Sequence, residues 1–347
     1  MEIPADPVLV ALLERATSEA LPGSARENEM FWELVAEAVE SVPVDEVLSV
    51  GMTFCRADAT AMRATGAGLL AELGNLPERG EEVVEALASL LGRELEPDVV
   101  RIALHGIATT GLETGLPVLL PPASHPDSAV RLDATHALYS CAGTPAAAVA
   151  VEALILLSDD PDDDVRDWAT FGLGTQIEST DDRIVPALAA RLHDTYLDVR
   201  EEAALGLARR GDARAFEPVR VLLEADEVSA QTVEAAGYLA DERLLRPLVE
   251  LGEWWEDESD VLRLAIARCD PVARERFDDR VRELVELIQD GLSGASVTTV
   301  HSTHDLTTEL RVGDEIWWIE DLLGRPDVQD DPPRAAAIVL AELEDRR

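Results

Sequence analysis

The chain has 347 residues and a formal net charge of -41, with 70 acidic residues against 29 basic ones. A negative field of this size repels phosphate backbones, so direct binding of DNA or RNA is not expected and basic proteins are the favoured partners. Hydrophobic residues make up 47% and aromatic residues 4% of the chain. This composition is typical of small-residue helix packing and excludes a disordered chain.

All 29 basic residues are arginines, because the chain contains no lysine. Two interpretations stay open: a GC-rich coding bias that replaces Lys by Arg, or selection against lysine modification. The cysteines Cys55, Cys141 and Cys269 lie far apart and form no CxxC motif, so neither a zinc site nor a disulfide scaffold is indicated. The N-terminus lacks a basic secretory n-region, and no run is long and apolar enough to span a membrane. A cytoplasmic protein without a membrane partner is therefore predicted.

Residues 1–56 are expected to form an N-terminal helical cap. Asp6-Pro7 is a favourable helix start, because Asp is a good N-cap residue and Pro fits the first helical position. That helix should end near Leu21, before Pro22-Gly23. A second helix, with its apolar residues on one face, is expected from Ser24 to Val42.

Residues 57–270 contain a recurring sequence motif. Asp159 to Gln176 reads as an acidic turn followed by a helix that opens with Val165-Arg166, and Asp194 to Gly211 repeats it with Val199-Arg200. Related pairs that begin further copies are Met62-Arg63, Val100-Arg101, Val130-Arg131 and Leu262-Arg263. Such a repeat predicts stacked helical hairpins. Each landmark arginine is expected to pair with an acid of the same or an adjacent repeat, so that the pairs form a ladder.

The units resemble HEAT repeats. The resemblance rests on a first helix with Pro-x-Leu, as at Pro186, and a second helix with Val-Arg-x-x-Ala-Ala-x-x-Leu, as from Val199 to Leu207. More narrowly, they are similar to the short HEAT-like units of bacterial phycobilisome-lyase-type proteins. The resemblance covers roughly residues 57–270 and resumes in a C-terminal repeat and cap, residues 314–347. It implies an all-α fold, an α-solenoid of about eight helical hairpins, and it leaves the function open.

Residues 271–313 break the pattern and form a degenerate repeat or an insertion. A charged amphipathic helix is expected from Arg274 to Ile288. The segment from Ser296 to Leu310 is rich in Thr and Val and fits either a degenerate helix or a short β-hairpin. The distance from Arg263 to Arg334 is close to two repeat lengths, which favours the helix. The first helix of the last unit is expected from Ile316 to Leu323.

Two clusters could bind metal ions, and both lack a complete ligand set. His301-x-x-His304-Asp305 would bring three ligands together on a helix, and no further cluster completes a shell. The acidic run from Asp159 to Asp164 lacks the central Gly and the distal Glu of an EF-hand. Solvated segments are the favoured interpretation of both. No nucleophile, phosphate-loop or dinucleotide motif is present, so no catalytic, cofactor-binding or metal-ligating residue is assigned.

A partner-binding surface follows from the register of the second helices. The third, fourth and seventh residues after the landmark should face the core, which leaves the first, second and fifth facing outward, on the side that is concave in HEAT solenoids. These positions hold an apolar line with acids beside it: Asp133, His136, Asp167, Trp168, Phe171, Glu201, Glu202 and Leu205. The alternative is that Trp168 and Phe171 fill the core between repeats.

The favoured function is a non-catalytic scaffold or adaptor that binds a basic protein or peptide at this face. One alternative is a lyase-like HEAT-repeat enzyme or cofactor-handling protein. Another is an acidic immunity or antagonist protein directed against a basic toxin. A bound chromophore would favour the first alternative, and a tight complex with one strongly basic partner would favour the second.

The absence of lysine makes a chemical prediction. An amine-reactive label should attach to this chain at most once, at its N-terminal amine. Mass spectrometry of the labelled protein checks this, and an acyl-lysine or a side-chain isopeptide on cellular material would contradict it.

Overall fold

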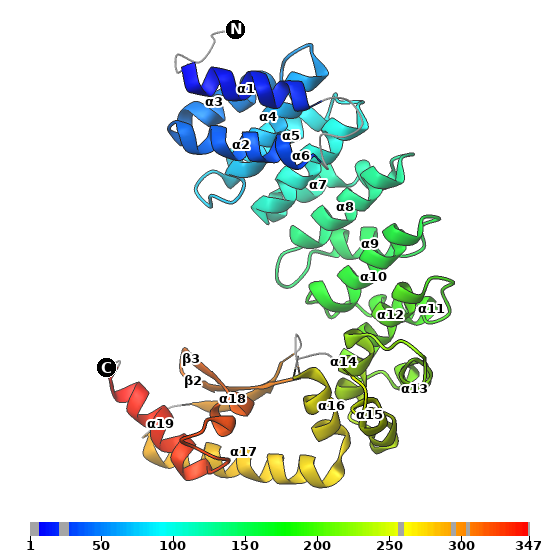
Figure 1. Cartoon of the computed structure of the whole chain (residues 1–347), viewed down its shortest axis with the longest axis vertical. Helices are drawn as coiled ribbons and strands as arrows, with labels where there is room; N and C mark the ends of the chain where they lie inside the picture. The colour runs from blue at the N-terminus through cyan, green and yellow to red at the C-terminus, as the bar shows by residue number, and fades with distance from the viewer. Residues whose placement is uncertain (1–6, 21–27, 256–259, 293–295, 303–305, 346–347) are drawn as a thin grey trace. The chain divides into compact units, whose positions relative to one another are not determined.

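A computed structural model describes residues 7–20, 28–255, 260–292, 296–302 and 306–345. The chain forms two compact units, Met1–Glu202 and Ala203–Arg347, and the boundary between them falls inside helix α12 (Leu197–Arg209). Each unit is built mainly of α-helices (Figure 1).

The first unit begins with three helices, α1 (Pro7–Glu19), α2 (Glu29–Ser41) and α3 (Val44–Phe54). The Asn28 side chain caps α2 by accepting a hydrogen bond from the Phe31 backbone N–H at 3.3 Å. The fully buried Phe31 ring lies against Gly68 of α4 (Thr60–Leu73), where a Cβ atom would come within 2.9 Å of it. Gly68 therefore allows the close approach of α2 to the first repeat.

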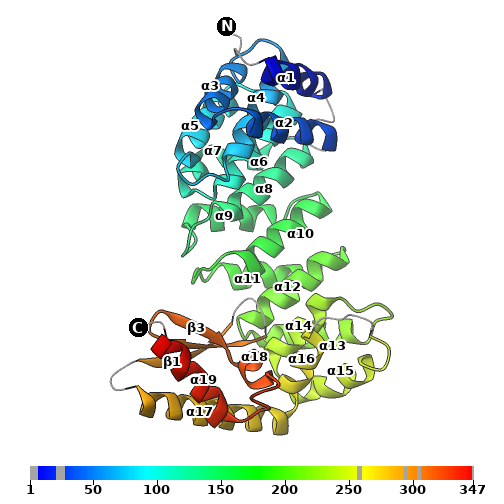
Figure 2. The same ribbon diagram turned by 60° about the vertical axis from the view of Figure 1, so that its left-hand side comes forward.

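Helical hairpins follow, and the second helices of successive hairpins pack on one another (Figures 1 and 2). The second helices of this unit are α4, α6 (Pro97–Thr110), α8 (Ser128–Ser140) and α10 (Asp163–Phe171). The first helices are α5 (Gly80–Leu91), α7 (Leu116–Leu119), α9 (Ala148–Leu157) and α11 (Ile184–Arg191). Helix α10 continues as one π-helical turn, Gly172–Gln176, and 3₁₀ turns Glu113–Gly115 and Pro122–Ser124 flank α7.

Four landmark arginines of this unit bind carboxylates of the next repeat, as the predicted ladder requires, whereas Arg200 donates to the carbonyls of Asp194 and Thr195. The pairs of this arginine ladder, with their Nε–O distances, are Arg63–Glu94 (2.5 Å), Arg101–Asp133 (2.7 Å), Arg131–Asp160 (2.7 Å) and Arg166–Asp194 (2.9 Å). A hydrogen bond from Arg166 also holds the pKa of the Asp194 carboxyl below its usual value.

The same guanidinium groups bind the turn that precedes their own helix. Arg131 Nη1 donates to the carbonyl of His125 at 2.9 Å, and Arg166 Nη1 donates to the carbonyl of Asp160 at 2.9 Å. Each arginine therefore ties the start of its helix to the following repeat. Since these side chains are largely buried, their polar atoms need partners that replace water.

The second unit continues with two hairpins and ends in a mixed module. The hairpin helices are α13 (Phe216–Leu223) with α14 (Ala230–Leu239), and α15 (Leu245–Leu251) with α16 (Val261–Cys269). The 3₁₀ turns Ala213–Ala215 and Glu242–Leu244 precede α13 and α15. The module consists of α17 (Pro271–Gly291), strands β1 (Val297–His301), β2 (Thr308–Val312) and β3 (Glu315–Trp318), and helices α18 (Ile319–Gly324) and α19 (Pro332–Asp345).

The three strands form one antiparallel sheet in the order β1-β2-β3, with Leu310 of β2 opposite Thr299 of β1 and Trp317 of β3. Helix α17 packs against α19 and β1, and the core of the module includes the buried Leu284 and Val339. Figure 1 shows the sheet beside α17, α18 and α19.

This sheet corrects two expectations. The helix expected within Ser296 to Leu310 is wrong, because that segment holds β1 and the start of β2. The helix expected from Ile316 to Leu323 begins only at Ile319, after β3. Alternating burial along β2 and the β-branched residues of β1 favour strands. Gly313, at φ 62°, then makes the tight turn from β2 to β3.

Within the described residues, none of the helices combines the length and the apolar character that crossing a membrane requires. Cys55, Cys141 and Cys269 are buried free thiols, and burial raises the pKa of each to about 12. They pack as small apolar side chains.

The ladder predicts a large difference between two arginine substitutions. Arg131→Gln removes one member of a largely buried ion pair and leaves Asp160 without its cation, so the free energy of unfolding should fall by about 3 kcal/mol. Arg183→Gln removes a half-exposed arginine paired with Asp181 and should leave the free energy of unfolding nearly unchanged, because solvent screens this pair. Chemical denaturation measures both, and equal losses would show that the ladder is not a main source of stability.

A candidate partner-binding surface

Four aromatic side chains of two neighbouring repeats gather at the surface of the first unit. His136 and Tyr139 lie three residues apart on α8, and Trp168 and Phe171 lie three residues apart on α10. Such spacing puts each pair on one face of its helix. We call these four residues the aromatic cluster.

The rings of the aromatic cluster contact one another edge to face or tilted. The Trp168 ring centroid lies 4.6 Å from that of His136 and 5.4 Å from that of Phe171. Tyr139 completes the group, with ring centroids 6.0 Å from Phe171 and 5.8 Å from His136. These contacts hold the rings in place without covering them, because Trp168 remains 38% exposed.

The exposure of Trp168 decides against the alternative that it fills the core between repeats. The core positions of α10 are taken by Val165 and Ala169, which are fully buried. Phe171 is half-buried and belongs to both environments. Sequence reasoning missed Tyr139, although its spacing of three from His136 was a usable signal.

A second feature of α10 is a carboxylate beside Trp168, one oxygen of which lacks a hydrogen bond. The Oδ1 atom of Asp167 is buried and has no hydrogen-bond partner among the residues that the structure describes. Burial first, and then the charges of Asp198, Asp164 and Glu201, raise the pKa of Asp167 to about 6. The same group of acids raises the pKa of Tyr196, with Asp198 as the largest cause. The local field is therefore strongly negative.

Three of the residues predicted to face outward are buried instead. Asp133 is 6% exposed, Glu202 8% and Leu205 4%, so their expected place on an open surface is wrong. Asp133 binds Arg101 in the arginine ladder, at 2.7 Å. Every residue from Glu202 to Ala208 of α12 is buried, which shows that this part of α12 is covered on more than one face. Leu205 also belongs to the second unit.

The two candidate metal clusters do not form the expected arrangements. His301 lies at the end of strand β1 rather than on a helix, and His304 and Asp305 fall outside the described residues. In the acidic run, Asp160 binds Arg131 and Asp162 caps α10. Across the described ranges, no set of three or more His, Cys, Asp or Glu residues has a geometry that could hold a metal ion.

The stacked hairpins and their ladder define an α-solenoid repeat protein. A profile of HEAT repeats matches residues 84–174 and 151–235. Protein YibA of Escherichia coli (strain K12) is 34% identical over 113 residues, which span 33% of this chain and 40% of YibA. The chain therefore contains HEAT repeats over residues 84–235.

The solved structure of E. coli YibA agrees with this fold. It has a TM-score of 0.56 at 21% sequence identity, covering 77% of this chain and 98% of that one, and at this identity the likeness concerns the fold alone. The complex of CpcE and CpcF of phycocyanin lyase from Nostoc sp. PCC7120 has a TM-score of 0.40 at 15% identity, covering 63% of this chain and 93% of that one. At that TM-score it adds nothing to the assignment of the fold.

The raised pKa of Asp167 predicts how stability depends on pH. Because the folded-state pKa of about 6 lies above the ordinary 3.8, the contribution of this group is present below pH 4 and is lost as pH rises through 6. Asp167→Asn should therefore raise the free energy of unfolding at pH 7 by about 1 kcal/mol after allowance for solvent screening. The gain should vanish toward pH 4.

Denaturation of both proteins at pH 4 and pH 7 tests this. Asp182→Asn is the matched control, because Asp182 is an exposed carboxylate outside the surface and reports only the relief of long-range repulsion. An equal gain in both variants would show that Asp167 is not held in an unfavourable site.

Proposed function

We propose that the chain is a non-catalytic scaffold that binds a basic, amphipathic protein segment at the aromatic cluster and the carboxylates beside it. HEAT solenoids commonly offer extended surfaces to protein partners, which supports this class of function. The sequence match to YibA spans 40% of that protein and carries no activity over to this chain.

One observation carries the proposal: the exposed Trp168 follows directly after a carboxylate whose Oδ1 has no hydrogen-bond partner within the described part of the chain. An arginine or lysine of a partner could contact the face of the indole and donate to Asp167. A cation there would also relieve the repulsion among Asp167, Asp198 and Glu201 that raises the pKa of Asp167. The site therefore suits a cationic side chain with apolar neighbours.

Charge favours the same class of partner. With a net charge of -41, the chain attracts basic proteins at long range and repels acidic ones. Such steering mainly raises the association rate and weakens with added salt. The aromatic cluster would supply the short-range affinity, since central aromatic residues dominate many protein interfaces.

The test uses a labelled amphipathic peptide with arginines on one helical face and leucines on the other. Trp168→Ala should raise the Kd of this peptide about 30-fold, equivalent to about 2 kcal/mol, because it removes the central aromatic contact. Trp254→Ala is the matched control: Trp254 is a 53% exposed tryptophan of the second unit, and its removal should leave the Kd unchanged. Fluorescence anisotropy measures both, and a thermal melt confirms that each variant is folded.

Two outcomes would contradict the proposal. One is equal affinity of wild type and Trp168→Ala for the peptide; the other is a loss of stability of about 3–5 kcal/mol on Trp168→Ala, the range for a buried core aromatic, with unchanged affinity in the folded fraction.

The ionisation of Asp167 gives an independent test of the same surface. Affinity for the arginine peptide should increase as pH rises from 5 to 7, because Asp167 becomes charged over this range. Asp167→Asn should abolish most of this pH dependence. If wild type and Asp167→Asn show the same profile, the carboxylate takes no part in binding.

A further inference from the structure

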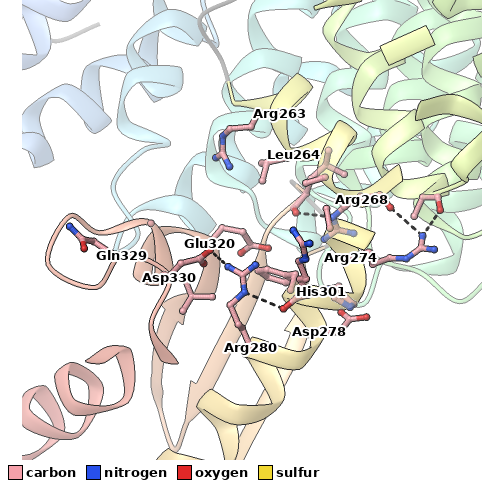
Figure 3. Close-up of a pocket in the computed structure, with 18 residues that line it drawn as sticks. Arg263, Leu264, Arg268, Arg274, Asp278, Arg280, His301, Glu320, Gln329 and Asp330 are labelled. Atoms are coloured by element: carbon pink, nitrogen blue, oxygen red, sulfur yellow. Dashed lines mark hydrogen bonds and ion pairs between the residues drawn. The ribbon is translucent and has the colours of Figure 1, made fainter. Parts of the chain in front are cut away.

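The second unit contains a cleft of about 740 Å³ whose wall is rich in arginine. It lies between α16, α17, β1, α18 and the segment before α19, and Figure 3 shows its polar side chains. The basic residues that line it are Arg263, Arg268, Arg274, Arg276 and Arg280, against the acidic Asp278, Glu320 and Asp330. The chain has a net charge of -41, so the excess of positive charge along this cleft is opposite in sign to the charge of the whole chain and needs a physical explanation.

Arg274 repeats the local geometry of the arginine ladder. It is the fourth residue of α17, as Arg131 is of α8 and Arg166 of α10. Its Nη1 donates to the carbonyl six residues earlier, that of Arg268, at 3.1 Å, and also to the carbonyl of Ala240 at 2.5 Å. The local sequence therefore builds the same turn and the same arginine position.

Arg274 differs from the ladder arginines in the partner of its Nε and Nη2 atoms. In the ladder, these atoms meet a carboxylate of the next repeat, as those of Arg131 meet Asp160. After α17, the chain forms the β-sheet instead of a helical hairpin. No carboxylate of the described residues forms an ion pair with Arg274, which is among the residues that line the cleft (Figure 3).

The neighbouring arginines divide into fixed and uncompensated ones. Arg280 is held by an ion pair with Asp330 and a hydrogen bond to the carbonyl of Arg276 at 3.1 Å. Arg268 donates to the carbonyl of Leu306 at 3.0 Å. The Arg276 side chain, in contrast, has no hydrogen-bond or ion-pair partner in the part of the chain that the structure describes. Arg276 thus lines the cleft without an ion-pair partner, and Arg274 lines it without a direct ion pair, although its charge helps to lower the pKa of the Asp241 carboxyl.

The wall of the cleft that contains Glu320 is polar, and hydrogen bonds hold its side chains in place. Glu320 accepts hydrogen bonds from the Thr308 N–H at 2.7 Å and from the Thr308 hydroxyl at 3.0 Å, and burial raises its pKa. The Thr308 hydroxyl also lies 3.2 Å from His301 Nδ1, so Thr308 links His301 to Glu320.

We propose that this cleft binds the phosphate group of a small organic phosphate, with Arg274 and Arg276 contacting the phosphate where the ladder lacks its next carboxylate. A phosphate oxyanion matches the donor geometry of guanidinium groups. The volume lies within the range of small-molecule sites. A long polyanion is disfavoured, because the remainder of the acidic chain would repel the phosphates outside the cleft.

Calorimetric titration at low ionic strength tests the proposal with three probes: inorganic phosphate, pyrophosphate and ADP. Wild-type protein should bind pyrophosphate or ADP with a sub-millimolar Kd, and a tighter Kd for ADP than for pyrophosphate would identify an organic phosphate as the ligand class. Arg276→Gln should raise the Kd at least 10-fold, and Arg274→Gln should do the same while a thermal melt reports any loss of folding. Arg282→Gln, on the same helix but paired with Asp279 outside the cleft, should leave the Kd unchanged.

Several outcomes would overturn it. No binding by wild type at millimolar probe, or an unchanged Kd on Arg276→Gln, removes the site. An equal loss on Arg282→Gln shows that the overall charge, not the cleft, attracts the anion. Binding of inorganic phosphate as tight as that of ADP removes the organic ligand class, and tight binding of a single-stranded oligonucleotide that depends on Arg276 would replace the small phosphate by a nucleic acid. None of these outcomes bears on the aromatic cluster of the first unit.

Discussion

The arginine ladder is the interaction on which the repeat architecture depends. The guanidinium groups of Arg63, Arg131 and Arg166 each bind a carbonyl in the turn before their own helix and a carboxylate in the following repeat, as Arg131 does with His125 and Asp160. A charge that is largely removed from water is stable only with such partners, so the position of one repeat fixes the position of the next. Apolar packing between second helices supplies the bulk of the burial, and the ladder sets the register.

Both candidate sites contain charged side chains that have no ion-pair partner in the arginine ladder. Since the chain has far more acids than arginines, many carboxylates lack a cation. Asp167 is one of them, and its raised pKa is the direct result. In the second unit, the sheet after α17 replaces the repeat that would continue the ladder, so Arg274 has no next-repeat carboxylate among the described residues. One site is therefore short of positive charge and the other short of negative charge.

The positions of the residues in the proposed partner-binding surface could be predicted only in part. The repeat register placed Trp168 outside the core, and its exposed fraction of 38% agrees with that position, while the buried Val165 and Ala169 occupy the inward positions of α10. The same register failed for Asp133, Glu202 and Leu205, which are buried. A side chain about 100° around the helix from the core is exposed or buried according to the distance between its helix and the neighbouring element. The spacing of the repeats in the sequence does not determine that distance.

The sequence by itself determined the helical repeats, the positions of their arginines and the pairing of these with acids, because apolar spacing, helix starts and turns are local properties. Only the tertiary structure decided the rest. The three-stranded sheet owes its stability to burial of Leu310 and Val312 against distant helices, and a short Thr- and Val-rich segment has no such neighbours in sequence. The aromatic cluster and the arginine cleft likewise join residues from different elements, so their chemistry arises from three-dimensional proximity.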